Sequence, residues 1–242
     1  MKKYGLLGQS LTHSFSKSFF TQKFEQEQID AVYDNFEMQR IEDVEELWRN
    51  NRFSGLNVTI PYKQVIIPFL DELTPEAAAI GSVNTILFHD GKRIGANTDA
   101  FGFQQMIKPF LLNTHHKALI LGNGGVMKSV KYVLQQIGLD VLVAARNPNV
   151  GEFQLNEVNE LMIKHCGIII NCTPVGTYPN VDEALNLPYH ALNDGHLVVD
   201  LIYNPVHTLF LTHAKQQGAV TLNGETMLKE QALKAWELWN LS

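Results

Sequence analysis

The feature that most limits the fold of this chain is a glycine-rich turn placed between a strand and a helix. Lys117–Leu121 is an apolar run of strand length, Gly122–Gly125 follows it, and Val126–Ile137 has the apolar spacing of a helix. Glycines in such a turn let the backbone approach a phosphate, and the helix start offers its unbonded N–H groups to the anion. The spacing departs from GxGxxG, because Met127 occupies the third glycine position. The stretch therefore predicts a dinucleotide-binding βαβ unit.

The end of the next predicted strand, Asp140–Ala145, indicates which dinucleotide the unit takes. A site for NAD carries Asp or Glu there, to bind the ribose hydroxyls. This chain has no acid at that point and continues instead with Arg146. A guanidinium suits a phosphate, so NADP is favoured; the alternative is an ordinary loop arginine.

Further apolar runs predict the rest of a parallel sheet. They lie at Gly167–Asn171, Leu197–Ile202 and Ala219–Leu222, and a helix is predicted at Val206–Gln217. Ligands bind beyond the carboxyl ends of parallel strands. Three polar residues are placed at such ends: Asn171, Thr173 and Tyr203.

The first hundred residues alternate strands with helices and end in a hairpin. The predicted strands are Lys3–Gly8, Ala31–Phe36, Val83–Phe88 and Arg93–Ala96, and the predicted helices begin near Ser16 and cover Ile41–Asn51. No linker composition separates this part from the rest. The change of pattern near Ala100 therefore marks the expected domain boundary.

Asn57–Lys63 combines a short strand with a helix start. Val58 and Ile60 are predicted on the buried face of the strand, and Pro61 in the first turn of the helix. Lys63 would then lie beside the positive end of the helix dipole, which eases loss of its proton near neutral pH. The alternative is a surface lysine.

Two serines, Ser14 and Ser16, stand at another helix start. Either could be an N-cap. Together, two hydroxyls beside unbonded N–H groups could also bind a carboxylate.

Composition excludes several classes of protein. The 242 residues have a formal charge of −6, which argues against a nucleic-acid or anionic-membrane binder. No apolar run reaches membrane-spanning length, and no zinc-binding spacing of His and Cys occurs. The cysteines, Cys166 and Cys172, are expected as small core residues in a reducing cytoplasm. We expect a cytoplasmic protein without metal, nucleic-acid partner or membrane contact.

Nine short motifs follow one another along the chain, each at a strand end or a helix start. In order they are His13–Ser16, Asn57–Lys63, Gly81–Thr85, Gly95–Asp99, Gly122–Gly125, Ala145–Asn147, Asn171–Gly176, Asp200–Pro205 and Met227–Ala232. In this order, over its whole length, the chain resembles the shikimate dehydrogenase family.

The resemblance implies an oxidoreductase that interconverts shikimate and 3-dehydroshikimate with NADP(H), on the route to chorismate and the aromatic amino acids. The implied fold is α/β. It has an N-terminal substrate domain of residues 1–100, a Rossmann-like doubly wound NADP-binding domain of residues 101–223, and a last helix within 224–242 that returns to the substrate domain. The implied assembly is a monomer or a homodimer.

The resemblance also implies residue roles. Lys63 would transfer the proton, and Asp99 would be its hydrogen-bonding partner on the reacting hydroxyl. The other implied substrate ligands are Ser14, Ser16 and Tyr203 at the carboxylate, and Thr59, Asn84 and Gln231 at the ring hydroxyls. The implied cofactor ligands are Gly122, Asn123, Gly124, Gly125, Val126, Ala145, Arg146, Asn147, Thr173, Pro174, Val175, Leu201 and Gly224.

The chain departs from the family pattern at several points. Lys17 stands where the family usually has proline, which adds a cation near the carboxylate ligands, and Phe20-Thr21 replaces a His-Asn pair. A second basic residue often follows the first in the family, whereas the next one after Arg146 is Lys164. The stretch Asn147–Asn156 is also short. The preference for NADP is therefore less secure than the reaction.

Three alternatives were weighed against this interpretation. A quinate or dual-specificity relative would use NAD as readily, and Arg146 counts against it. A non-catalytic shikimate-binding regulator would lack Lys63 or Asp99, or carry a DNA-binding segment, and the sequence shows neither change. A serine hydrolase built on His13 and Ser14 would need a GxSxG turn, which the sequence lacks.

Overall fold

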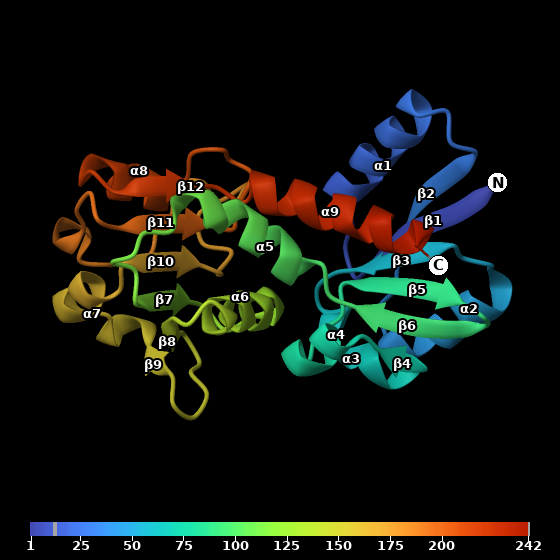
Figure 1. Ribbon diagram of the computed structural model, residues 1–242, viewed down its shortest axis with the longest axis horizontal. Helices are drawn as coiled ribbons and strands as arrows, with labels where there is room; N and C mark the ends of the chain where they lie inside the picture. Colours follow the sequence, from blue (N-terminus) through green and yellow to red (C-terminus); the bar gives the residue numbers. More distant parts are fainter. Residues whose placement is uncertain (12–13, 242) are drawn as a thin grey trace. The chain divides into compact units, whose positions relative to one another are not determined.

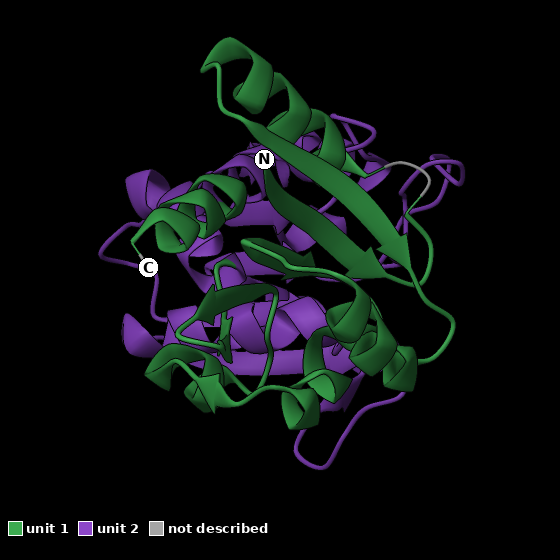
Figure 2. Ribbon diagram, turned by 90° about the vertical axis from the view of Figure 1, so that its right-hand side faces the viewer, with its two compact units in different colours: residues 1–98, 231–242 green, residues 99–230 purple. Residues whose placement is uncertain are grey.

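The computed structural model describes residues 1–11 and 14–241. The chain forms two compact units, residues 1–98 with 231–242 and residues 99–230 (Figures 1 and 2). Each unit is built on one six-stranded sheet with helices packed on it. None of the helices in the described ranges is long and apolar enough to cross a membrane.

The sheet of the first unit mixes parallel and antiparallel pairs in the order β2-β1-β3-β5-β6-β4. Its strands are β1 (Lys2–Gly8), β2 (Ala31–Glu37), β3 (Gly55–Val58), β4 (Glu72–Leu73), β5 (Thr85–His89) and β6 (Lys92–Ala96). Its helices are α1 (Phe15–Gln26), α2 (Val44–Asn50), α3 (Tyr62–Val65), α4 (Pro75–Ile80) and the greater part of α9 (Glu225–Asn240). Strand β1 runs parallel to β2 and β3, and β5 runs antiparallel to β3 and β6.

The strand in the Asn57–Lys63 motif differs from its prediction. All four residues of β3 are buried, because the strand is central in its sheet and both of its faces are covered: Leu56 and Val58 lie in an apolar cluster, and Gly55 packs against the Trp239 ring. The strand ends at Val58, and Ile60, predicted on the buried face, is 69% exposed. Pro61 is the N-cap of α3 and not its first helical residue. The predicted position of Lys63 in the first turn of a helix is confirmed.

Aromatic side chains join α9 to the first sheet. The rings of Tyr4 and Trp239 lie 4.9 Å apart, and the Trp239 indole Nε1–H donates to the carbonyl oxygen of Ile86 at 3.1 Å. Gly55 makes room for this contact, since a Cβ there would lie 2.3 Å from the Trp239 ring. The expected return of the last helix to the N-terminal sheet is confirmed.

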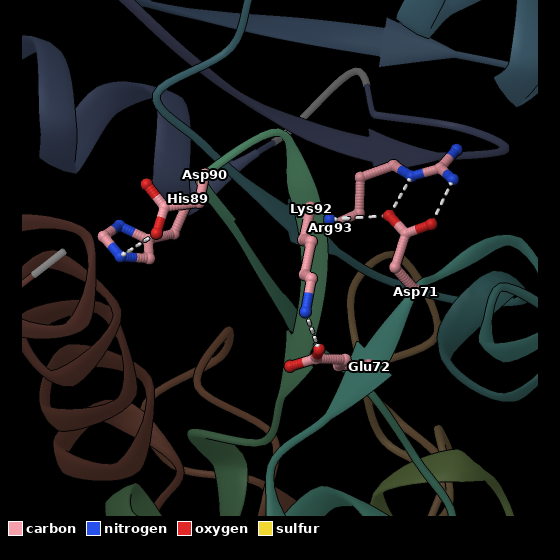
Figure 3. Close-up of polar contacts among 6 residues, drawn as sticks. All are labelled: Asp71, Glu72, His89, Asp90, Lys92 and Arg93. Carbon is pink, nitrogen blue, oxygen red and sulfur yellow. Dashed lines mark hydrogen bonds and ion pairs between the residues drawn. The ribbon is translucent and has the colours of Figure 1, made fainter.

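The β4–β6 edge of this sheet carries ion pairs that Figure 3 shows in close-up. Both the Nε and a terminal nitrogen of Arg93 donate to the carboxylate of Asp71 at 2.7 Å, and Lys92 pairs with Glu72. The Arg93 guanidinium also lies 4.5 Å from the ring centre of Trp48. Strand β4, which these pairs hold, is two residues long and was not predicted from the sequence.

The sheet of the second unit is parallel throughout, in the order β12-β11-β10-β7-β8-β9. Its strands are β7 (Lys117–Leu121), β8 (Asp140–Ala145), β9 (Phe153–Gln154), β10 (Ile168–Asn171), β11 (Leu197–Asp200) and β12 (Val220–Leu222). Counted along the chain, this is the order 3-2-1-4-5-6 of dinucleotide-binding folds, in which the ligand crevice opens between the first and fourth strands. The predicted Rossmann-like fold is confirmed, and the crevice falls at the carboxyl ends of β7 and β10.

The helices of this unit are α5 (Asp99–Ile107), α6 (Gly125–Gln136), α7 (Glu160–His165), α8 (Leu209–Gln216) and the first six residues of α9. Helix α8 begins three residues later than predicted, because the Thr208 hydroxyl caps it by accepting from the N–H of Leu211. Helix α7 and strand β9 were not predicted. Both cysteines are free thiols; Cys166 lies in the core of this unit, where burial raises its pKa to about 11.

Candidate active site

A cluster of buried amide and hydroxyl groups lies at the start of β5. Asn84 and Gln231 are 3% and 9% exposed, and Thr98 is fully buried. The Asn84 amide nitrogen donates to Thr98 Oγ1 at 3.0 Å and to Gln231 Oε1 at 3.3 Å, and the Thr98 N–H donates to Asn84 Oδ1 at 2.7 Å. Two predicted ligands of ring hydroxyls, which are 147 residues apart in sequence, therefore touch each other.

The cluster continues along the sheet toward α1. The Asn57 amide nitrogen donates to Thr85 Oγ1 at 3.2 Å, and Asn57 Oδ1 accepts from the Tyr33 hydroxyl at 2.8 Å. Burial raises the pKa of the Tyr33 phenol, and a hydrogen bond with the Ser16 side chain opposes that rise. Ser16, Asn84 and Gln231 thus belong to one polar network inside the first unit.

The start of α1 holds the predicted carboxylate ligands. Ser14 is the N-cap, and its Oγ accepts from the Lys17 N–H at 3.2 Å, which leaves the hydroxyl hydrogen available to a ligand. Lys17, the departure from the family pattern, has its ammonium 3.5 Å from Asp34 Oδ1. His13 lies outside the described residues.

Helix α3 and the turn before it carry Lys63 and Thr59, both half-buried. The Lys63 carbonyl accepts from the Val83 N–H at 2.7 Å, so the single turn of α3 is tied to the segment that leads into the amide cluster. Thr59 is held by its own N–H, which donates to the carbonyl of Leu7 at 2.9 Å. The backbone around Lys63 is therefore fixed on both sides.

Asp99 and Tyr203, the remaining predicted substrate residues, belong to the second unit. Asp99 is the first residue of α5 and is 5% exposed. Tyr203 follows β11 in a loop and is 39% exposed. Their roles stay predictions.

The glycine-rich turn between β7 and α6 has the form of a phosphate cradle. Gly122 has φ +100°, and a Cβ there would lie 2.8 Å from Thr173 Cγ2. Gly124 is the N-cap of the 12-residue α6 and offers no side-chain cap, and Cβ atoms built at Gly124 and Gly125 meet nothing within 4 Å. The first N–H groups of α6, including that of Val126, lack a side-chain cap. This end of the helix fits the pyrophosphate of a dinucleotide.

A fully buried carboxylate, that of Asp200, organises the opposite side of the crevice. It accepts hydrogen bonds from the Asn171 amide at 3.0 Å, the Thr208 hydroxyl at 2.6 Å and the Ile202 N–H at 3.1 Å. Asn171 Oδ1 in turn accepts from both the N–H and the hydroxyl of Thr173, at 2.9 and 2.7 Å. One buried residue therefore fixes the loops that follow β10 and β11.

These two loops hold the other predicted cofactor residues. Thr173 Oγ1 accepts from the Val175 N–H at 3.2 Å, and the exposed Pro174 lies between them. Leu201 and Gly224 also come together: a Cβ at Gly224 would lie 2.1 Å from the Leu201 carbonyl oxygen, so only glycine fits there.

Arg146, which is predicted to bind the 2′-phosphate, lies at the end of β8. Ala145 is buried at the last position of the strand and Arg146 is exposed directly after it. Within the described ranges no hydrogen bond or ion pair occupies the Arg146 guanidinium. The Asn147 carbonyl accepts from the Asn123 amide at 2.8 Å, which joins this loop to the glycine-rich turn.

A surface hollow of about 490 Å³ lies elsewhere in the second unit. Its lining residues are His207, Leu211, Thr212, Lys215, Gln216 and Thr221. None of the predicted site residues lines it. The glycine-rich turn before α6 is the better candidate for a ligand site, because an uncapped helix start and the positive φ of Gly122 occur together there.

Sequence reasoning missed several polar residues that organise the site. Tyr33 lies in none of the nine motifs, and Thr85, Thr98 and Asp200 lie in motifs without an expected role of their own. The available signal was a polar residue inside an apolar run, as in the segment Leu197-Val198-Val199-Asp200, because a buried polar group needs a partner.

Comparisons with known proteins bear on this site. Residues 6–86 match the family model described as the shikimate dehydrogenase substrate binding domain. A shikimate dehydrogenase (NADP(+)) of Clostridium perfringens is 34% identical over 254 aligned residues, which cover 99% of this chain and 93% of that protein. The chain belongs to the shikimate dehydrogenase family.

Solved structures of family members agree with the fold. The shikimate 5-dehydrogenase of Thermus thermophilus in complex with NADP(H) and shikimate is 30% identical, with a TM-score of 0.87 and coverage of 100% of this chain and 94% of that one. A quinate dehydrogenase of Corynebacterium glutamicum in complex with NAD is 27% identical, with a TM-score of 0.88 and the same coverage.

Proposed function

We propose that this protein is an NADP-dependent shikimate dehydrogenase, which reversibly reduces 3-dehydroshikimate to shikimate. The observation that carries the proposal is the buried cluster of Asn84, Thr98 and Gln231 beside the helix of Lys63. The cluster offers buried amide and hydroxyl groups, the kinds of group that bind a polyol, in a chain that is similar to a shikimate dehydrogenase over its whole length.

Substrate binding is proposed to use both kinds of polar group in the first unit. Asn84, Gln231 and Thr59 would bind the ring hydroxyls. Ser14 and Ser16 would donate their hydroxyls to the carboxylate at the positive end of α1, and Tyr203 would add a third donor.

Proton transfer is assigned to Lys63 and Asp99. In the direction of reduction, the Lys63 ammonium would polarise the carbonyl and give its proton to the oxygen of the reacting carbon. In the reverse direction the neutral amine would take that proton. The Asp99 carboxylate would accept a hydrogen bond from the reacting hydroxyl.

The cofactor site is proposed at the carboxyl ends of β7, β8 and β10. NADP, when bound there, supplies or accepts the hydride. The uncapped N–H groups of α6 and the Gly122–Gly125 turn would hold the pyrophosphate, and Arg146 the 2′-phosphate. The loops of Thr173–Val175 and Leu201, fixed by Asp200, would position the nicotinamide end.

Absorbance of the reduced nicotinamide tests the proposal, with shikimate and quinate each paired with NADP⁺ and NAD⁺. Turnover that is strong with shikimate and NADP⁺ and weak with the other pairs is the expected result. Comparable turnover with quinate or NAD⁺ would identify a dual-specificity enzyme. Shikimate binding without turnover in any pair would show a binding protein and overturn the catalytic assignment.

A further inference from the structure

A carboxylate is fixed in the loop that follows Arg146, and none of the predicted roles uses it. Glu152 lies between β8 and β9, half-buried, and its Oε2 accepts from the Asn149 N–H at 2.8 Å while its Oε1 accepts from the Asn149 amide at 3.0 Å. The Glu152 N–H donates back to the Asn149 carbonyl at 3.0 Å, across a turn in which Gly151 has φ +85°. The loop is thus closed on itself and holds the carboxylate in one place.

The same carboxylate also reaches the glycine-rich turn. Glu152 Oε2 accepts from the Asn123 amide at 2.9 Å, and that amide donates to the Asn147 carbonyl as well. Asn123 lies between β7 and α6, and Asn147 directly follows Arg146. In a dinucleotide-binding fold these two segments frame the adenosine ribose, the first at the pyrophosphate and the second at the 2′ position. Glu152 is therefore anchored to both walls of that subsite.

The carboxylate is charged at neutral pH. Burial pushes the pKa of Glu152 upward, but the hydrogen bonds from Asn149 and Asn123, with the nearby Lys131, outweigh it and leave the pKa below its ordinary value. Residues 147–163 contain no lysine or arginine. Next to Arg146, the loop thus adds a negative charge where a second positive one would help to bind a 2′-phosphate.

We propose that Glu152 is a specificity-determining residue that reduces the preference for NADP over NAD; the inference rests on the proposed cofactor site. A fixed carboxylate can accept a hydrogen bond from a ribose hydroxyl, whereas it repels a phosphate of the same sign. Arg146 and Glu152 then act in opposite directions on the same position of the cofactor. The protein should use NAD more readily than a relative whose loop carries two cations.

Binding of two nucleotide fragments tests this without turnover. Isothermal titration calorimetry would give the Kd of adenosine 2′,5′-bisphosphate and of AMP for the wild-type protein, for Glu152→Gln and for Glu152→Asp. Removing one charge near a phosphate in partly screened surroundings should tighten 2′,5′-bisphosphate binding about tenfold in Glu152→Gln. AMP binding should change less than twofold, and the gain should shrink at high salt. Glu152→Asp, which keeps the charge, should stay close to wild type.

Glu160→Gln is the matched control, because it removes an equal charge from an exposed position in the same unit. An equal ratio of the two Kd values in wild type and Glu152→Gln would overturn the role of Glu152, as would an equal change in Glu160→Gln. If the wild-type protein binds neither fragment, the proposed cofactor site fails and the inference fails with it. Melting temperatures of all variants separate these outcomes from loss of fold.

Discussion

Replacing Asp200 by asparagine should change how the stability of the protein depends on pH. Burial is the main cause that raises the pKa of this fully buried carboxyl from 3.8 to about 6; the hydrogen bonds from Thr208, Ile202 and Asn171 oppose the rise. Because the pKa is higher in the folded state, the unfolded chain loses this proton first as the pH increases. The stability that the protonated carboxyl contributes is complete below about pH 3.8 and is lost as the pH rises through about 6.

The size of the effect follows from the two pKa values. The interval from 3.8 to about 6 corresponds to about 3 kcal/mol, at about 1.4 kcal/mol for each pH unit. An amide does not titrate, so the Asp200→Asn variant lacks this term. The free energy of unfolding of the variant minus that of wild type should rise by about 2.5 kcal/mol between about pH 4 and pH 7, because the wild-type protein has already lost part of the term at pH 4. At any single pH, the difference in free energy of unfolding also includes the hydrogen bond that the Thr208 hydroxyl loses in the variant. Only the change of that difference with pH reports on ionisation of the carboxyl.

Urea denaturation followed by circular dichroism, at several pH values between about 4 and 7, measures this difference. Agreement between two spectroscopic probes must first show that the two units do not unfold separately. Asp194→Asn, at an exposed site in the same unit, is the control for removal of a carboxyl that is not buried. A difference that is equally flat for Asp200→Asn, or a ¹³C carboxyl titration of Asp200 with a midpoint below about 5, would refute the reasoning.

Three more predictions test other parts of the structure. Lys63→Ala should lower kcat by several orders of magnitude and leave the Kd of shikimate, measured by calorimetry, nearly unchanged, because the residue acts mainly in the transition state; unchanged turnover would remove it from the mechanism. Gly224→Ala should lower the free energy of unfolding, measured in a thermal melt, by about 2–4 kcal/mol, because its Cβ would lie 2.1 Å from a backbone oxygen. Gly124→Ala is the control. A Cβ there meets nothing within 4 Å, so the free energy of unfolding should fall by only a few tenths of a kcal/mol. Asp71→Asn should cost at most about 1 kcal/mol at pH 7, because solvent screens its bond with Arg93. Arg93 lowers the pKa of Asp71 to about 2, so the cost should fade as the pH drops from 3.8 toward 2 in urea titrations, and a constant cost would contradict that assignment.

The second unit could be predicted closely from the sequence because local signals agreed there. The strands Lys117–Leu121 and Asp140–Ala145 have their predicted bounds, since each is a continuous apolar run followed by a turn of glycine or polar residues. Strands β4 and β9 have two residues each and exist through pairing with a neighbour, so no periodicity could announce them. The error at Ile60 has another cause: the strand ends at Val58, so the alternation of buried and exposed residues does not extend to Ile60.

The sequence predicts candidate site residues one by one, but it does not predict the network that joins them. A resemblance supplies Ser16, Asn84 and Gln231, yet nothing in the sequence shows that a chain of hydrogen bonds through Tyr33 and Asn57 connects them. Such links depend on the register of neighbouring strands, which places Asn57 directly opposite Thr85. Register follows from the whole sheet and not from one segment.

The network also changes what can be expected of substrate selectivity. Asn84 and Gln231 are bonded to each other and to Thr98 without any ligand, over distances of 3.0 to 3.4 Å. A substrate hydroxyl therefore exchanges one hydrogen bond for another and does not satisfy a group that was left unpaired. The free energy gained in such an exchange is small, about 0.5–1.5 kcal/mol for each bond. An analogue that lacks one ring hydroxyl lets the internal bond form again, so this cluster by itself discriminates weakly. Strong selectivity must then come from the charged groups, because a charged group that is left buried without a partner costs much more free energy than an amide.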